Sequence, residues 1–156
     1  MEIKDSWNRR KFESGAVRDI DSGKGRCDLA PLDSIGYVLG DTILIKINTY
    51  VRDGNKTCLV DAIKEFSCRY FNDMYTAMLE VSKHYENGCE KYGERNWEKG
   101  IPLHSYIDSA VRHYFKFMRG DDDEPHNRAF LWNLLGALWT QDNKPELIDL
   151  PFSQSR

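Results

Sequence analysis

Apolar side chains recur at helical spacing along most of the chain after residue 57. Steps of three and four residues place one side chain per turn on the same face, which is the pattern of an amphipathic helix. The first such stretch predicts one long helix from Cys58 that extends as far as Lys91, with Gly93 as a natural stop. Its apolar positions are Leu59, Ile63, Phe66, Tyr70, Met74, Met78, Val81 and Tyr85.

Two more helices follow. One apolar stripe predicts a helix from about Leu103 to Met118, closed by Arg119-Gly120. The acidic run 121–124 and Pro125 predict the start of another helix, which reaches about Trp139, because carboxylates satisfy the free amides of the first turn. This last helix is apolar almost all round, which favours a place in the middle of a bundle or in an oligomer interface.

The remaining segments are less regular. Residues 1–30 carry scattered glycines among many charges, so we expect an irregular arm that packs on the body or stays mobile. Residues 43–51 are rich in β-branched side chains, which fits a short β arm, and a helix continuing from about Leu32 is the alternative. We therefore predict an all-α fold in a single domain 1–156, with a helical core at 58–140 and a tail at 141–156.

Composition narrows the class of protein. A charged content of 30% and a mean hydropathy of -0.64 exclude a membrane protein, and no apolar run reaches the ~20 residues that span a bilayer. The beginning of the chain has no apolar stretch typical of a secretory signal, and the four cysteines form no CxxC pair. We expect reduced thiols in a cytoplasm. The net charge of -3 argues against a dedicated nucleic-acid binder.

Some polar residues do not fit the helical pattern. His126 and Asn133 share one face of the apolar helix, where an unsatisfied group costs about 1–3 kcal/mol, so they either bind a ligand or serve as a cap and a tie to a neighbour. Glu86 and Glu90 form an i,i+4 carboxylate pair on the long helix, an arrangement that can hold Mg²⁺ in a bundle. A solvated charged face is the alternative for these glutamates.

The loop at 91–97 combines cations with aromatic rings. Lys91 and Arg95 suit phosphates, Asn96 suits a purine edge, and Trp97 is expected to fill the core. A rigid connecting loop in which Asn96 caps a turn is the alternative. Arg112 and His113, on the helix predicted from about Leu103, would also suit a phosphate. Exposed ion pairs are the alternative, because Asp108, Arg112 and Lys116 lie at i,i+4 spacing.

Several segments, in order along the chain, resemble the phage dATP/dGTP diphosphohydrolases of the MazZ type. They are ESGAVRD (13–19), GKGRCDL (23–29), EKYGERNWEKG (90–100), DSAVRH (108–113), RGDDDEPH (119–126) and WNLL (132–135). The resemblance implies a MazG-like all-α bundle that cleaves dGTP and dATP to the monophosphate and pyrophosphate. It further implies a divalent metal, Mg²⁺ first with Mn²⁺ or Co²⁺ as alternatives, and a homo-oligomer in the host cytoplasm. In phages that use diaminopurine, the implied role is to supply dGMP and to drain dATP.

The resemblance also suggests roles. The MazG pattern places ExxE on one helix and ExxD on another, whereas here Glu86 and Glu90 are four apart and His126 and Asn133 stand where acids are expected. We predict Glu90 as the carboxylate that positions water. The predicted metal ligands are Glu86, Glu90, Asp123 and His126, with Glu80, Glu94 and Asp122 as further candidates. The predicted substrate-binding residues are Lys24, Arg26, Lys91, Arg95, Asn96, Arg112, His113 and Asn133.

A second hypothesis needs no catalysis. A helical module that binds a nucleotide or a partner protein would keep the cations and the aromatic loop without a metal. Release of pyrophosphate from a deoxynucleoside triphosphate separates the two hypotheses.

Overall fold

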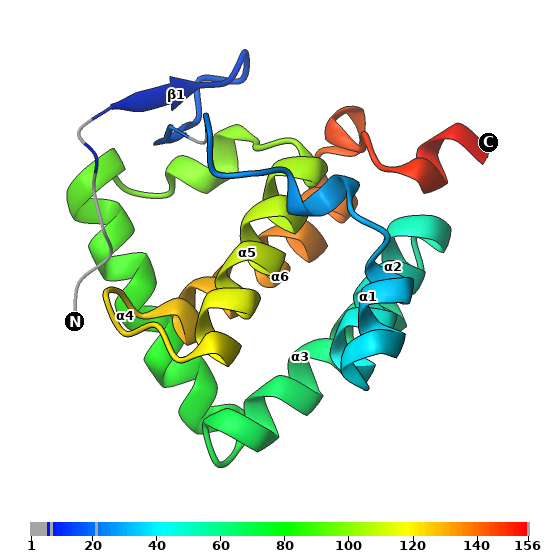
Figure 1. Cartoon of the computed structure of the whole chain (residues 1–156). Helices are drawn as coiled ribbons and strands as arrows, with labels where there is room; N and C mark the ends of the chain where they lie inside the picture. The colour runs from blue at the N-terminus through cyan, green and yellow to red at the C-terminus, as the bar shows by residue number, and fades with distance from the viewer. Residues whose placement is uncertain (1–5, 7, 21, 156) are drawn as a thin grey trace.

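The computed structural model describes residue 6, residues 8–20 and residues 22–155. An N-terminal hairpin precedes a set of helices, and short 3₁₀ turns join some of them (Figure 1). The elements are β1 (Arg9–Lys11), β2 (Val17–Asp19), η1 (Cys27–Leu29), α1 (Leu32–Leu39), α2 (Thr42–Asp53), α3 (Lys56–Tyr70), α4 (Met74–Tyr92), η2 (Asn96–Lys99), α5 (Leu103–Arg119), α6 (His126–Asn143), η3 (Pro145–Leu147) and η4 (Pro151–Ser155). The predicted all-α class is confirmed. None of the described helices is long and apolar enough to cross a membrane.

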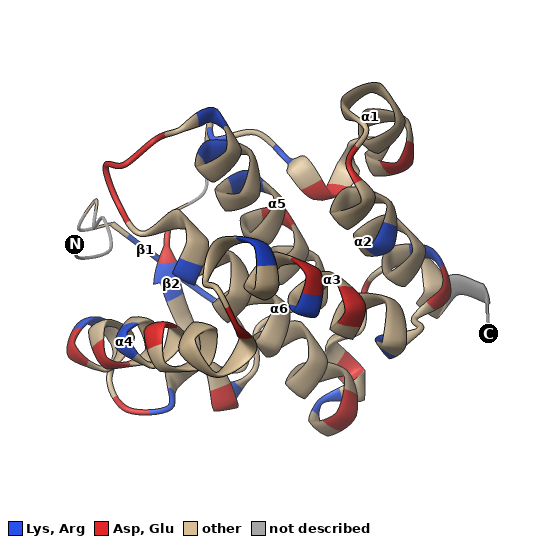
Figure 2. Cartoon of the chain, turned by 90° about the horizontal axis from the view of Figure 1, so that it is seen from below, with Lys and Arg blue, Asp and Glu red and all other residues tan. Residues whose placement is uncertain are grey.

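The β arm lies at the N-terminus and not at 43–51. β1 and β2 are antiparallel, and their register pairs Arg10 with Arg18. The turn between them uses Gly15 at φ 93°, a left-handed conformation that suits a residue without Cβ. Arg9 lies over the ring of Tyr92 at 5.0 Å, so the hairpin contacts the end of α4, and Figure 2 shows the basic positions of both strands close to that helix.

The segment 43–51 is helical, so the predicted strand there is wrong. Its buried residues, Ile43, Leu44, Ile47, Tyr50 and Val51, follow a helical period and not the alternation of a strand. Asp41 caps the helix by accepting a hydrogen bond from the Leu44 amide at 3.0 Å. Burial of one helical face together with a good cap outweighs the β preference of the individual side chains.

The single helix predicted from Cys58 to Lys91 is divided in two. α3 ends at Tyr70, and Asn72 takes a left-handed conformation at φ 75°. Asp73 then caps α4 by accepting from the Thr76 amide at 2.7 Å. The apolar spacing continues across this break, which is why periodicity alone does not reveal it. α3 and α4 diverge from the turn, so α4 faces the hairpin (Figure 1).

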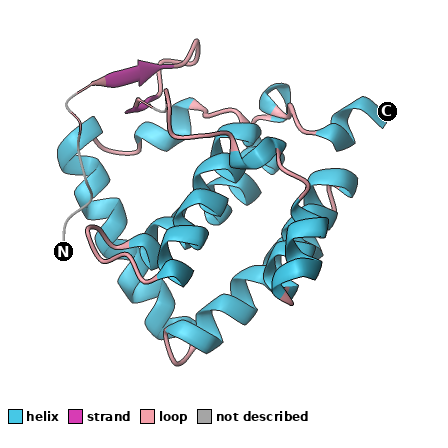
Figure 3. Cartoon of the chain, viewed as in Figure 1, coloured by secondary structure: helices cyan, strands magenta, loops and turns pink. Residues whose placement is uncertain are grey.

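α6 is the central helix. It packs against α3, α4 and α5. The view coloured by secondary structure shows that helices make up most of the molecule around it (Figure 3). Gly136 allows the closest approach to α5, because a Cβ there would lie 2.3 Å from Cε1 of Tyr106. The prediction of an all-round apolar helix in the middle of a bundle is confirmed. The predicted helix from Leu103 is confirmed as α5, and the tail packs back on the body through buried Leu150 and Phe152.

Candidate functional site

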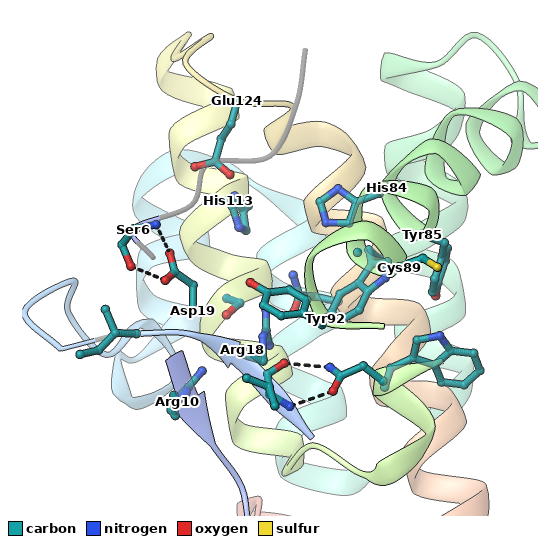
Figure 4. A pocket seen from close by; sticks show the side chains of 18 of the residues that line it. Ser6, Arg10, Arg18, Asp19, His84, Tyr85, Cys89, Tyr92, His113 and Glu124 are labelled. Carbon is teal, nitrogen blue, oxygen red and sulfur yellow. Dashed lines mark hydrogen bonds between the residues drawn. The ribbon is translucent and has the colours of Figure 1, made fainter. Parts of the chain in front are cut away.

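A cavity of about 940 Å³ lies between the hairpin, α4 with its following loop, α5 and α6. Its size is within the range of small-molecule sites. Figure 4 shows His84 and Tyr85 of α4 on one side, Asp19 and Glu124 on the other, and Arg18 between them. The cavity therefore brings together segments that are far apart in the sequence.

Arg18 supplies a buried positive charge. Its guanidinium carbon lies 5.3 Å from the ring centre of Trp132 and 5.8 Å from that of Tyr106. Its Nη1 atom is enclosed and has no hydrogen-bond partner among the described residues. Burial lowers the pKa of Arg18 to about 10, so the group remains a cation at neutral pH. A guanidinium with an Nη1 that is enclosed and unpartnered in the described chain, beside a cavity, suits an anion.

Asn96 fixes the strand that carries Arg18. Its Oδ1 accepts from the Val17 amide at 2.9 Å, and its Nδ2 donates to the Val17 carbonyl at 2.8 Å. The side chain is buried and lines the cavity wall. The predicted contact of Asn96 with a purine is replaced by this tie to β2, because both ends of the amide already bind backbone.

Arg112 fixes the other side of the N-terminal arm. It forms a buried ion pair with Asp108 at 2.6 Å and donates to the Gly25 carbonyl at 2.7 Å. Asp108 in turn accepts from the Cys27 amide at 2.7 Å. The prediction that Asp108 and Arg112 are exposed is therefore wrong. Arg112 lines the cavity, but its charge is neutralised by Asp108 and serves to hold the loop before η1.

Two polar atoms that are buried without a partner in the described part of the chain belong to residues that line the cavity. Asn133 donates to the Ala129 carbonyl at 2.8 Å, whereas its Oδ1 is buried with no partner among the described residues. His84 Nδ1 is in the same position, again within the described part of the chain. Burial lowers the pKa of His84 to about 3, and Arg128 is the next contributor, so the ring is neutral at pH 7. Leaving such groups unsatisfied costs about 1–3 kcal/mol each, which a hydrogen-bonding ligand would recover.

A histidine pair closes one end of the cavity. His113 Nδ1 lies 2.9 Å from His126 Nδ1, and His126 Nε2 lies 2.8 Å from Asp123 Oδ1. A carboxylate oxygen of Glu124 lies within 4.8 Å of a ring nitrogen of each histidine. Figure 4 shows Glu124 and His113 at this end of the cavity. Burial first, and His126 second, hold the pKa of His113 well below its usual range. Asp123 and His126, predicted as metal ligands, are thus brought together.

The glutamates predicted to complete a Mg²⁺ site lie elsewhere. Glu86 and Glu90 are exposed on α4 and do not line the cavity. Among the described residues, the groups of three that could hold a metal are His113–Glu124–His126 and Asp121–Asp123–His126. The four predicted metal ligands therefore do not come together. α4 faces the cavity with His84 and Tyr85, whereas Glu86 and Glu90 are exposed on the same helix. The further candidates Glu80 and Asp122 also lie outside the cavity, and Glu94 is at its rim.

A family comparison covers most of the elements around this cavity. Residues 55–150 match the family described as dATP/dGTP diphosphohydrolase, N-terminal. The chain belongs to this family. The match spans α3 to α6 and therefore includes most of the cavity wall, while Arg18 lies before it. No curated protein and no solved structure matches the chain.

The cations that sequence reasoning assigned to phosphate in this family member divide into two groups. Lys24 and Arg95 line the cavity, although Arg95 is exposed and pairs with Glu98 at 2.6 Å. Arg26 pairs with Asp28 at 2.8 Å outside the cavity, and Lys91 does not line it either. Trp97 packs on Trp139 with ring centres 4.9 Å apart, which confirms its predicted place in the core.

Sequence reasoning missed several residues of the cavity. Arg18 was visible as part of the GAVRD segment, but nothing in the helical pattern indicated that an arm residue enters the body. Tyr85 looked like one more apolar position of the long helix, and it lines the cavity. Glu124 looked like a helix start. Each of these residues meets other elements of the cavity that are distant in the sequence. Sequence spacing therefore does not indicate that they share a cavity.

Proposed function

We propose that this protein hydrolyses purine deoxynucleoside triphosphates, dGTP and dATP, to the monophosphate and pyrophosphate. The observation that carries the proposal is the enclosed guanidinium of Arg18 in an aromatic cavity that also holds the unpartnered acceptor of Asn133. A triphosphate supplies the missing anion, and a purine supplies the missing donor. Membership of a family named for this reaction supports the same substrate class.

The phosphate chain is placed against the cations of the cavity. Arg18 offers as a donor its Nη1, which has no partner among the described residues, and Lys24 and Lys116 also line the cavity. Burial lowers the pKa of Lys24, with Asp19 acting in the opposite direction. Charge-assisted hydrogen bonds of this kind are about twice as strong as neutral ones.

The base is placed against the aromatic wall. Tyr85, Tyr92 and Trp132 line the cavity, and a purine ring stacks on such side chains at offset or edge geometry. Asn133 Oδ1 accepts from a base amino group, which both guanine and adenine carry on different edges. Cytosine carries an amino group as well, so the choice of purines rests on the family match, which names both dATP and dGTP.

In the reaction, water attacks the α-phosphorus and pyrophosphate leaves. Asp19 replaces Glu90 as the carboxylate that we assign to orienting this water, because Asp19 lines the cavity and Glu90 does not. Burial alone would raise the pKa of Asp19, but hydrogen bonds from the Ser6 hydroxyl and amide outweigh it and lower the pKa. The carboxylate is therefore ionised at neutral pH and accepts hydrogen bonds from water.

Metal dependence and the biological setting rest on the resemblance. A divalent ion remains part of the proposal, with Mg²⁺, Mn²⁺ and Co²⁺ as the ions to test, but the predicted Mg²⁺ ligands do not assemble and we assign no step to that ion. The proposed setting is the cytoplasm of a phage-infected cell in which diaminopurine replaces adenine. There a homo-oligomeric enzyme would supply dGMP and remove dATP.

The test is an assay of pyrophosphate release from each of the four deoxynucleoside triphosphates, with each of these metals in turn. We expect release from dGTP or dATP, and a loss of at least tenfold in kcat/KM for Arg18→Gln, since a charged buried hydrogen bond contributes about 1.5–3 kcal/mol. Arg26→Gln is the matched control, because Arg26 is exposed and outside the cavity. Binding of dGTP without pyrophosphate release under any condition would favour the non-catalytic module.

A further inference from the structure

The end of the cavity at His113, His126 and Glu124 has the composition of a transition-metal site. His113 lies in the last turns of α5, Glu124 in the connecting loop and His126 at the beginning of α6. His126 is fully buried at its side chain, so the pair is not a surface cluster. One ligand atom from each of the three residues lies within 4.8 Å of the other two.

The distance between the two rings fits adjacent ligands of one ion. A metal bound by imidazole nitrogen sits about 2.1 Å from it, and two nitrogens at the right angle of a six-coordinate ion are then about 3.0 Å apart. The observed separation of the two Nδ1 atoms is 2.9 Å. Imidazole ligands favour Zn²⁺, Co²⁺ and related ions, whereas Mg²⁺ requires oxygen donors.

Asp123 has the position of a supporting group behind the site. Its Oδ1 lies 2.8 Å from Nε2 of His126, on the side of the ring away from His113. When Nε2–H donates to this carboxylate, the lone pair of the ring is on Nδ1 and points at the other imidazole. A carboxylate behind a histidine ligand commonly fixes the tautomer in this way.

We propose that His113, His126 and Glu124 bind a divalent transition metal of the Zn²⁺ and Co²⁺ class, with Asp123 positioning His126. Three protein ligands leave coordination positions open to other donors, and two of these ligands, His113 and Glu124, line the cavity. The role of this metal toward a triphosphate rests on the proposed function, whereas the site itself does not.

The test is a titration of the full chain with Co²⁺, followed by visible absorption, and with Zn²⁺, followed by calorimetry. We expect about one equivalent to bind, more tightly than Mg²⁺. His113→Asn and Glu124→Gln should each weaken binding at least tenfold, and Asp123→Asn should weaken it by about 10–100-fold. His104→Asn is the matched control, because His104 pairs with Asp149 away from the cavity and should leave binding unchanged.

Circular dichroism of each variant establishes that it is folded, and the partly exposed His113 and Glu124 make the test independent of the buried His126. Failure of the wild-type chain to bind Co²⁺ or Zn²⁺, or binding that survives both His113→Asn and Glu124→Gln, would overturn the proposal. His113 and His126 would then be a hydrogen-bonded pair without a metal. Since the readout is metal binding, its outcome is separate from that of the pyrophosphate assay.

Discussion

At the scale of single residues, the site depends on polar atoms that the protein leaves unsatisfied. Arg18 Nη1, His84 Nδ1 and Asn133 Oδ1 are all buried without partners among the described residues, and all three residues line one cavity. A single buried polar atom without a partner can have a purely structural explanation. Three around one space indicate a ligand that completes them.

Sequence reasoning found Asn133 because a polar residue on an apolar helix stands out. It also found His113 and His126 from their place beside an apolar stripe and an acidic run. It failed for Arg18, since an arginine among many charges in a short arm is indistinguishable from a solvated one. It failed for Glu86 and Glu90 because an i,i+4 carboxylate pair does not reveal which face of the helix is covered.

The lowered pKa of His84 makes the stability of the fold depend on pH. Its pKa is depressed to about 3 in the folded state and is near 6.5 when unfolded, so the unfolded state binds more protons between these values. Stability is therefore complete above pH 6.5 and is lost as the pH falls, by about 1.4 kcal/mol per pH unit for one such group. His84→Gln should reduce that slope between pH 6 and pH 4, measured by urea unfolding.

His104→Asn is the control for this measurement. The hydrogen bond to Asp149 raises the pKa of His104, and burial opposes it, so its contribution is present below pH 6.5 and disappears as the pH rises through the folded value. The slope between pH 6 and pH 4 should stay close to that of the wild type. An unchanged slope in His84→Gln would contradict the buried neutral imidazole.

At the scale of elements, the hairpin carries Arg18 of the site, and hydrogen bonds from Asn96 hold its second strand to the body. Replacing Asn96 with Ala removes both hydrogen bonds to Val17 and leaves the strand's backbone groups unpaired. We expect a loss of about 1–3 kcal/mol in the free energy of unfolding, and weaker binding of dGTP because Arg18 is no longer held.

Asn143→Ala is the matched variant for this experiment. Asn143 makes one exposed hydrogen bond to the Trp139 carbonyl, at the end of α6. Its replacement should change stability by less than about 0.5 kcal/mol and leave dGTP binding unaffected. Equal effects of the two substitutions would mean that the Asn96 tie does not position the hairpin.

The α5–α6 contact makes a prediction about packing. Gly136→Ala places a Cβ 2.3 Å from Cε1 and 2.6 Å from Cζ of the buried Tyr106 ring, so the helices must separate. We expect destabilisation by about 1–3 kcal/mol in thermal or urea unfolding. Gly88→Ala, on α4 with no atom within 4 Å of the new Cβ, should instead stabilise by up to about 1 kcal/mol. A neutral Gly136→Ala would show that the two helices are less closely packed than described.

The element boundaries show where periodicity is informative. α5 and α6 were predictable because an apolar stripe is bounded by glycine or by an acidic start. The break between α3 and α4 was not predictable, because Asn72 and Asp73 interrupt the helix without interrupting the apolar spacing. The cap at Asp73, three residues before Thr76, is the local signal that could have placed it.

At the scale of the whole molecule, the helices form the frame and the N-terminal arm completes the cavity. Asn96 of η2 and Asp108 and Arg112 of α5 hold that arm from two sides. The sequence supported an all-α class and a family resemblance, and the family match is shown over residues 55–150. The contacts between the arm and the body were not predictable, since they join residues about 80 positions apart.

A crystal structure of the protein with dGMP bound tests the central claim most directly. The account predicts the nucleotide in the cavity between β2, α4, α5 and α6, with its phosphate on Arg18 and its base against the aromatic wall, within reach of Asn133. A nucleotide bound elsewhere on the molecule, or an empty cavity at saturating dGMP, would contradict it.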